Sequence, residues 1–223
     1  MSFVRIRELR KTYDTGESRV TPLDGINLDI VAGEFLSLMG PSGSGKTTLL
    51  NIVAGIDRQT SGSVKVGDVE LSRLSDAQLG RWRNRNMGYV FQQFNLVPVL
   101  TALENVELPL MLLPLSGRRR RRQAEIALAA VGLSDRLKHY PRQLSGGQQQ
   151  RVAIARAVVT DPAIIAADEP TGNLDTATAD EIFALIEHFN KDRGQTFLVV
   201  THGEQIASRA HRTLRMKDGL FVT

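Results

Sequence analysis

Short runs of apolar residues separated by turn residues dominate the first third of the chain, as they do in segments rich in β-strands. Residues 25–31 and 34–39 are predicted strands, joined at Ala32-Gly33. Residues 63–71 are typical of an antiparallel edge element, and residues 87–91 of a further strand. The pattern therefore begins with β-structure rather than with helices.

The pattern changes to helices and loops between residues 95 and 159, where prolines at positions 98, 109, 114 and 141 interrupt the chain. Strands return at residues 163–167 and 196–200, whose nearly continuous apolar runs suit parallel strands buried on both faces. Between these two strands, Ile182, Leu185, Ile186 and Phe189 fall on one helical face. The pattern predicts one α/β domain over residues 1–223, with a core of residues 1–93 and 160–223 and an inserted helical lobe of residues 94–159.

The composition is that of an ordinary globular protein, with 223 residues, 42% of them hydrophobic and 23% charged. No stretch of about 18 apolar residues is present, so we expect no membrane-spanning helix. The first seven residues lack the apolar centre of a secretion signal, which favours a cytoplasmic location. The chain has no cysteine, which excludes disulfides and thiolate metal sites, and its net charge of +4 is too small to indicate a nucleic-acid partner.

Five consecutive arginines, Arg118 to Arg122, follow Gly117. The next residues continue in a helical pattern, so we interpret the run as the solvated start of a helix. Attraction to anionic lipid headgroups or to RNA is the alternative. Positive charge at a helix start opposes the helix dipole, so the run does not stabilise that helix.

Residues 40–47 read Gly-Pro-Ser-Gly-Ser-Gly-Lys-Thr and match the phosphate-binding loop pattern. The loop lies between a predicted strand and a predicted helix, so the alternative, a glycine-rich turn with a stray lysine, is a poor one. Its glycines let backbone N–H groups approach phosphate oxygens, and the following helix adds its dipole. Lys46 can reach the β and γ phosphates of ATP, and the Thr47 hydroxyl can bind Mg²⁺. The predicted nucleotide-binding residues here are Gly40, Ser42, Gly43, Ser44, Gly45, Lys46, Thr47 and Thr48.

Two adjacent acids end the apolar strand near residue 167. A carboxylate delivered to the sheet edge beside the phosphates is the partner that Mg²⁺ needs, so Asp168 is the predicted metal ligand. Glu169 is then placed to act as general base on the attacking water. A solvated strand end would explain the acids equally well if the chain lacked a phosphate loop.

The segment Ser145-Gly146-Gly147-Gln148 opens a predicted helix. Ser145 and Gln148 have the spacing of a capping box, which is a purely structural explanation. Two glycines in front of a helix N-terminus also leave room for a phosphate. The position of the segment, about a hundred residues after the phosphate loop and twenty before the acidic strand, favours the second interpretation.

Together these motifs resemble the ATP-binding cassette ATPases, and the resemblance extends over essentially the whole chain. Residues 144–151 resemble the family signature, and residues 168–175 are similar to its acidic strand and the following loop. The resemblance implies a phosphate-loop nucleotide-hydrolase core with a mixed sheet, an antiparallel β subdomain and a helical lobe. It also implies Mg²⁺-dependent ATP hydrolysis in a head-to-tail dimer of two copies of the chain.

The resemblance further implies roles for single residues. Tyr13 should stack on adenine, and His202 should contact the γ-phosphate. Gln92 should be a ligand of Mg²⁺ and should sense both the metal and the γ-phosphate. With Lys46 and Glu169, His202 completes the implied catalytic set. The signature residues Ser145, Gly146, Gly147 and Gln148, with Asp175 after them, should complete the site of the other copy.

A narrower resemblance is carried by residues 91–98 and 103–110, which look like the group of macrolide-export, lipoprotein-release and antimicrobial-peptide-resistance ATPases. This group implies an integral membrane permease as partner, with a periplasmic or extracellular partner beyond it. It implies peripheral attachment at the cytoplasmic face of the plasma membrane. Gly203 and His211 depart from the residues common in this group, so no single member is indicated.

Two rival functions remain open at this point. One is a cassette ATPase without transport, regulating a cell-wall or ribosomal partner; the other is a scaffold that binds ATP without hydrolysis. The apolar segment 94–113 favours transport if a permease helix docks there, but ordinary core packing explains it equally well. The sequence leaves open the transported substrate, the permease, the role of the arginine run, and whether the chain is a subunit or the cassette of a fused exporter.

Overall fold

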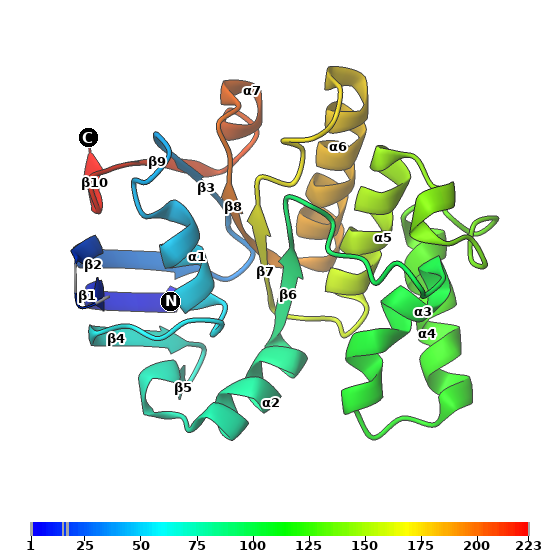
Figure 1. The fold of residues 1–223 in the computed structure, drawn as a ribbon, viewed down its shortest axis with the longest axis horizontal. Coiled ribbons are helices and arrows are strands. Elements are labelled where there is room, and N and C mark those ends of the chain that lie inside the picture. The colour runs from blue at the N-terminus through cyan, green and yellow to red at the C-terminus, as the bar shows by residue number, and fades with distance from the viewer. Residues whose placement is uncertain (1, 15, 17, 223) are drawn as a thin grey trace.

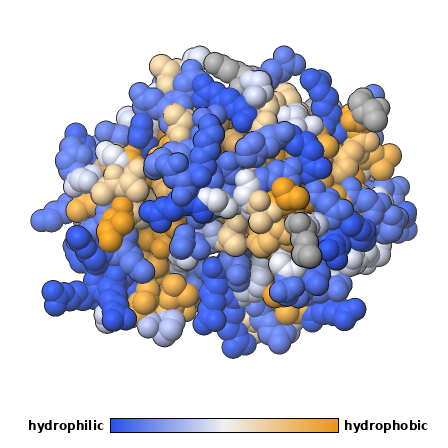
Figure 2. Space-filling model, turned by 180° about the vertical axis from the view of Figure 1, so that it is seen from behind, coloured by the Kyte–Doolittle hydropathy of each residue, from blue (hydrophilic) through white to orange (hydrophobic). Residues whose placement is uncertain are grey.

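The computed structural model describes residues 2–14, 16 and 18–222 of the chain. Figure 1 shows an antiparallel sheet at one end, a group of helices at the other and a second sheet between them. None of the described helices combines the length and apolar character needed to cross a bilayer. On the face seen in Figure 2, apolar side chains form small separate patches among hydrophilic ones.

The antiparallel sheet has the strand order β2-β1-β4-β5. β1 is Ser2–Asp14, β2 is Arg19–Val31, β4 is Ser61–Val66 and β5 is Val69–Glu70. The predicted strand 25–31 is therefore too short, because β2 pairs with β1 from Arg19 onward. The predicted single element 63–71 is also wrong in detail. It is a hairpin that turns at Gly67, with φ +57°, and runs into the short helix η1, Leu71–Arg73.

The second sheet has the order β10-β9-β3-β8-β7-β6. Its strands are β3 Phe35–Met39, β6 Met87–Val90, β7 Ile164–Asp168, β8 Thr196–Val200, β9 Arg212–Lys217 and β10 Leu220–Val222. Neighbours are parallel from β9 to β6, and only the β9–β10 pair among them is antiparallel. The mixed sheet expected of an α/β fold is confirmed.

Helices cover both faces of the mixed sheet, which explains why the central strands β3, β7 and β8 are mostly apolar and buried along almost their whole length. α1, Lys46–Val53, packs with Leu38, Ala166 and Val200 between the two sheets. α5, Gly146–Val158, and α6, Thr176–Arg193, share the opposite cluster with Ala167 and Val199. Alternate residues of each strand therefore face different sets of helices.

The remaining helices flank these elements. α2 is Asp76–Asn86, α3 Ala102–Glu107, η2 Leu108–Leu112, α4 Gly117–Ala130, η3 Pro141–Gln143 and α7 Glu204–Ala207. The arginine run begins α4 as predicted, with Ser116 as N-cap. Helices α3, α4 and α5 pack on one another, and α5 also packs on β6. The division at residues 94 and 159 stays a prediction, because the helices share one apolar cluster with the sheet.

The loop before α3 is held by one buried amide. Asn105 is fully buried, and its Oδ1 accepts a hydrogen bond of 2.7 Å from the Val97 N–H. Its Nδ2 donates to the carbonyls of Val97, Leu100 and Thr101 at 3.0–3.2 Å. The buried side chain thus satisfies four backbone groups of a half-buried loop.

The substitution Asn105→Ala should lower the free energy of unfolding by about 2–4 kcal/mol, because four hydrogen bonds of a fully buried side chain are lost and a cavity is left. Chemical denaturation measures this change. The control is Gln123→Ala, which removes an exposed amide from α4 and should cost no more than about 0.5 kcal/mol. Equal stability of the two variants would contradict the role assigned to Asn105.

Candidate functional site

The phosphate loop joins β3 to α1 and depends on glycine at two closely packed points. Gly40 has φ +148°, and a Cβ there would collide with the Met216 carbonyl. Gly45 has φ +99° and is the N-cap of α1, and a Cβ there would collide with the Pro22 carbonyl. The loop therefore passes close to its neighbours while the first N–H groups of α1 lack partners within the helix.

Lys46 folds back over this loop. Its Nζ donates to the carbonyls of Gly40 and Pro41, both at 2.8 Å, and only 5% of the residue is exposed. Burial lowers the pKa of the Lys46 ammonium, and the charges of Glu169 and Asp168 act in the opposite direction. The loop carbonyls thus hold a buried positive charge beside the start of α1.

Thr47 and Asp168 meet beside the loop. The Thr47 hydroxyl donates to Asp168 Oδ1 at 3.2 Å. Burial raises the pKa of the Asp168 carboxyl, and the negative charge of Glu169 acts in the same direction. A hydroxyl beside a partly buried carboxylate offers hard oxygen ligands, and a divalent cation would relieve the repulsion between the two acids. These residues therefore fit Mg²⁺.

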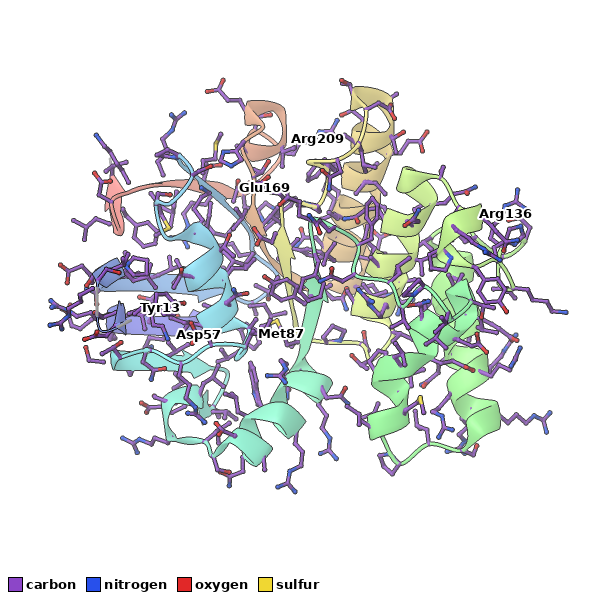
Figure 3. All side chains as sticks on the ribbon, viewed as in Figure 1. Tyr13, Asp57, Met87, Arg136, Glu169 and Arg209 are labelled. Carbon is purple, nitrogen blue, oxygen red and sulfur yellow. The ribbon has the colours of Figure 1, made fainter. Side chains whose placement is uncertain are left out.

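Glu169 lies at the end of β7, near the top of the sheet in Figure 3. Its Oε1 is 2.7 Å from His202 Nε2, and its Oε2 accepts a hydrogen bond of 3.1 Å from Gln92 Nε2. The Glu169 backbone is in the left-handed region, with φ 46°, and its N–H donates to the Val200 carbonyl. Both carboxylate oxygens are therefore oriented by side chains from other segments.

These residues surround one pocket of about 360 Å³. The predicted residues that line it are Tyr13, Ser42, Gly43, Ser44, Gly45, Lys46, Thr47, Thr48, Glu169 and His202. Gly40, Gln92 and Asp168 adjoin it through their hydrogen bonds to Lys46, Glu169 and Thr47. Thirteen of the residues chosen from the sequence are thus brought together.

Tyr13 lies at the pocket end away from Glu169, next to Asp57 (Figure 3). Its hydroxyl donates to Asp57 Oδ2 at 2.5 Å, and Lys11 Nζ lies 4.5 Å from the ring centroid. Burial raises the pKa of the Tyr13 hydroxyl, and the bond to Asp57 acts in the same direction. The ring is held in place but 42% exposed, so a flat ligand can stack on it.

The signature residues lie elsewhere, on the opposite face of the mixed sheet from α1 (Figure 1). Ser145 caps α5 and forms the full capping box with Gln148. A Cβ on Gly147 would collide with Thr178, whose N–H and hydroxyl donate to Asp175 at 3.0 and 2.6 Å. Those bonds lower the pKa of the Asp175 carboxyl. Ser145, Gly146, Gly147, Gln148 and Asp175 therefore form a second group outside the pocket.

Sequence reasoning missed several residues of the site. Val20 and Pro22 line the pocket because β2 pairs with β1 beside Tyr13, a register that apolar pattern does not reveal. Asp57 holds the Tyr13 hydroxyl from the turn after α1. Asn173 donates from its Nδ2 to the Gln92 carbonyl at 2.9 Å. Each of these acts through tertiary contacts rather than through a motif.

Comparison with known proteins agrees with this geometry. The family model of the ABC transporters matches residues 23–172. The lipoprotein-releasing system ATP-binding protein LolD of Geobacter metallireducens is 48% identical over 99% of this chain and 98% of its own. The macrolide export ATP-binding/permease protein MacB of Rhodopirellula baltica is 48% identical over 98% of this chain but only 32% of its own length.

A solved structure matches equally well. The dimeric structure of the ATP-binding cassette MJ0796 in a post-hydrolysis state, bound to ADP and Pi, has a TM-score of 0.91 and 46% identity, covering 99% of this chain and 97% of that one. The chain therefore belongs to the ABC transporter family. It is an ATP-binding ATPase of that family, of the kind whose hydrolysis of ATP powers a membrane permease.

Proposed function

We propose that ATP lies in the pocket with its adenine on Tyr13 and its phosphates over residues 40–48. The observation that carries this proposal is the Glu169 carboxylate, held between His202 and Gln92 at the end of the pocket that the phosphate loop forms. An acid fixed by two side chains beside a phosphate loop is suited to orient an attacking water. The exposed Tyr13 ring at the other end of the pocket supports the same direction of binding.

Glu169 acts in this proposal as the general base toward water. His202 orients the Glu169 carboxylate and contacts the γ-phosphate. Lys46 leaves the Gly40 and Pro41 carbonyls to neutralise the β and γ phosphates, and the loop N–H groups bind their oxygens. Mg²⁺, held by Thr47 and Asp168 with Gln92 as a further ligand, would neutralise charge that develops on the phosphates. No covalent intermediate is required, because phosphoryl transfer depends on positioning and charge.

The second group of residues would complete the site of another copy of the chain. Ser145, Gly146, Gly147 and Gln148 begin a helix, where backbone N–H groups favour an anion, and Asp175 lies beside them. Among the residues that the structure describes, these five are not part of the lining of the chain's own pocket. The MJ0796 cassette, 46% identical, forms dimers. A head-to-tail dimer would place each signature helix over the partner's ATP and bury the nucleotide.

The permease would attach this dimer to the cytoplasmic face of the plasma membrane. Val97, Val99, Met111 and Leu112 are exposed apolar residues of segment 94–113, and they support docking of a permease helix there. We assign residues 94–159 to the lobe that carries this surface. Similarity to a lipoprotein-releasing and a macrolide-export protein supports work on an envelope substrate, and we propose a periplasmic or extracellular partner beyond the permease.

Glu169→Gln should retain ATP binding within about threefold while kcat falls by roughly 10²–10⁴-fold, because the amide cannot accept the proton of water. The variant should also accumulate as a dimer with ATP in size-exclusion chromatography, since bound ATP is no longer consumed. Steady-state phosphate release and equilibrium nucleotide binding measure the two effects. Glu125→Gln, on the outside of α4, is the matched control and should keep the normal rate. Rapid hydrolysis by Glu169→Gln would overturn the assignment of the base.

A tagged Glu169→Gln chain, isolated from its native membranes with ATP, should bring with it a polytopic permease with a large extracytoplasmic domain. The trapped ATP-bound dimer makes this association long-lived. Mass spectrometry of the isolated complex identifies the partner, and a Lys46→Ala chain serves as control for association without bound ATP. Recovery with ribosomes, or only with soluble proteins, would contradict the transport function and leave the ATPase chemistry intact.

A further inference from the structure

The backbone just after Gln92 has an unfavourable conformation. Phe94 and Asn95 are consecutive non-glycine residues in the left-handed region, with φ 54° and 48°. The Asn95 N–H donates to the Gln93 carbonyl, which closes the turn still more tightly. Two such residues in sequence are rare and costly, so contacts from elsewhere must hold the turn.

One guanidinium supplies those contacts. Arg156 projects from α5, and its Nη1 donates to the Asn95 carbonyl at 2.5 Å while its Nη2 donates to the Phe94 carbonyl at 2.8 Å. Burial lowers the pKa of Arg156, as expected for a side chain packed into the protein. Within the described residues its hydrogen-bond acceptors are these two carbonyls, and it forms no ion pair with a carboxylate there. The planar guanidinium of arginine offers two parallel N–H donors, which match two successive carbonyls. The single ammonium of a lysine does not provide this geometry.

The same loop is held at its other end by Asn173, which donates to the Gln92 carbonyl at 2.9 Å. Between these two anchors, the Gln92 side chain reaches Glu169 Oε2 at 3.1 Å. The backbone of residues 92–95 is thus fixed from two sides, and its one catalytically placed amide points at the proposed base.

We propose that Arg156 is a positioning residue for ATP hydrolysis, which holds the Phe94–Asn95 turn so that Gln92 meets Glu169. The inference rests on the proposed roles of Gln92 and Glu169. Arg156 follows Ser145 by eleven positions on one helix, about three turns. A shift of the signature end of α5 would therefore carry the Gln92 loop with it.

Arg156→Met keeps most of the apolar stem but removes both donors. We expect kcat to fall roughly 10- to 100-fold with KM for ATP within about threefold, because the lost interaction orients the reacting groups and does not bind the nucleotide. Arg156→Lys, which keeps the charge but offers no planar fork, should recover only part of the rate. Nucleotide binding and thermal unfolding of each variant show whether it is folded.

The matched control is Arg83→Met. Arg83 projects from α2 and also donates to a backbone carbonyl, that of Gly55 at 2.7 Å, but this carbonyl lies after α1 and outside the segment 92–95. Its loss should lower the melting temperature while kcat stays within about twofold, since stability alone does not set the rate. An equal loss of kcat in Arg83→Met and Arg156→Met would mean that Arg156 has only a structural role, and would overturn the proposal.

A double-mutant cycle with Gln92→Ala tests whether Arg156 acts through Gln92. In the Gln92→Ala background, Arg156→Met should change kcat by less than about twofold, because the group that it positions is absent. A further tenfold loss in that background would overturn the inference. Normal rates for both Gln92→Ala and Glu169→Gln would instead refute the proposed function itself. Reduced rates for those two with a normal rate for Arg156→Met would refute only the role of Arg156.

Discussion

The hydrogen-bonded register of β3, β8 and β7 is the constraint on which the rest of the site depends. Leu38 pairs with Val200, and Val200 pairs with Asp168, so the three strands end at the same level. The ladder continues past the strands, because the Glu169 N–H donates to the Val200 carbonyl and the Thr201 N–H to the Leu38 carbonyl. The phosphate loop, the two acids and His202 leave one sheet edge together for this reason.

The apolar packing that fixes this register also separates the two halves of the chemistry. α1 and the phosphate loop lie on one face of the sheet, and α5 with the signature residues lies on the other. The tight fit of Gly147 against Thr178, which also bonds Asp175, joins the signature to the loop before α6. Each chain thus presents a pocket and, apart from it, a helix start suited to an anion. A second copy of the chain reconciles these two features.

Sequence patterns predicted those parts that depend on local chemistry. The phosphate loop, the acidic end of β7 and the mostly apolar central strands could be recognised because each is a continuous segment with its own physical requirement. The long pairing of β1 with β2, the hairpin at Gly67 and the sheet edge at β9–β10 could not, since their register depends on distant partners. Arg156, Asn173 and Asp57 escaped prediction for the same reason: their partners are backbone carbonyls or side chains far away in sequence.

The central claim, that two copies share each site, is tested most directly by mixing two inactive variants. Lys46→Ala removes the phosphate-loop charge, and Ser145→Arg blocks the signature helix, so each should be inactive alone. Random pairing makes about half of the dimers mixed, and each mixed dimer holds one intact site of two, so the mixture should recover on the order of a quarter of the normal ATPase rate. A mixture no more active than its separate components would contradict the shared site.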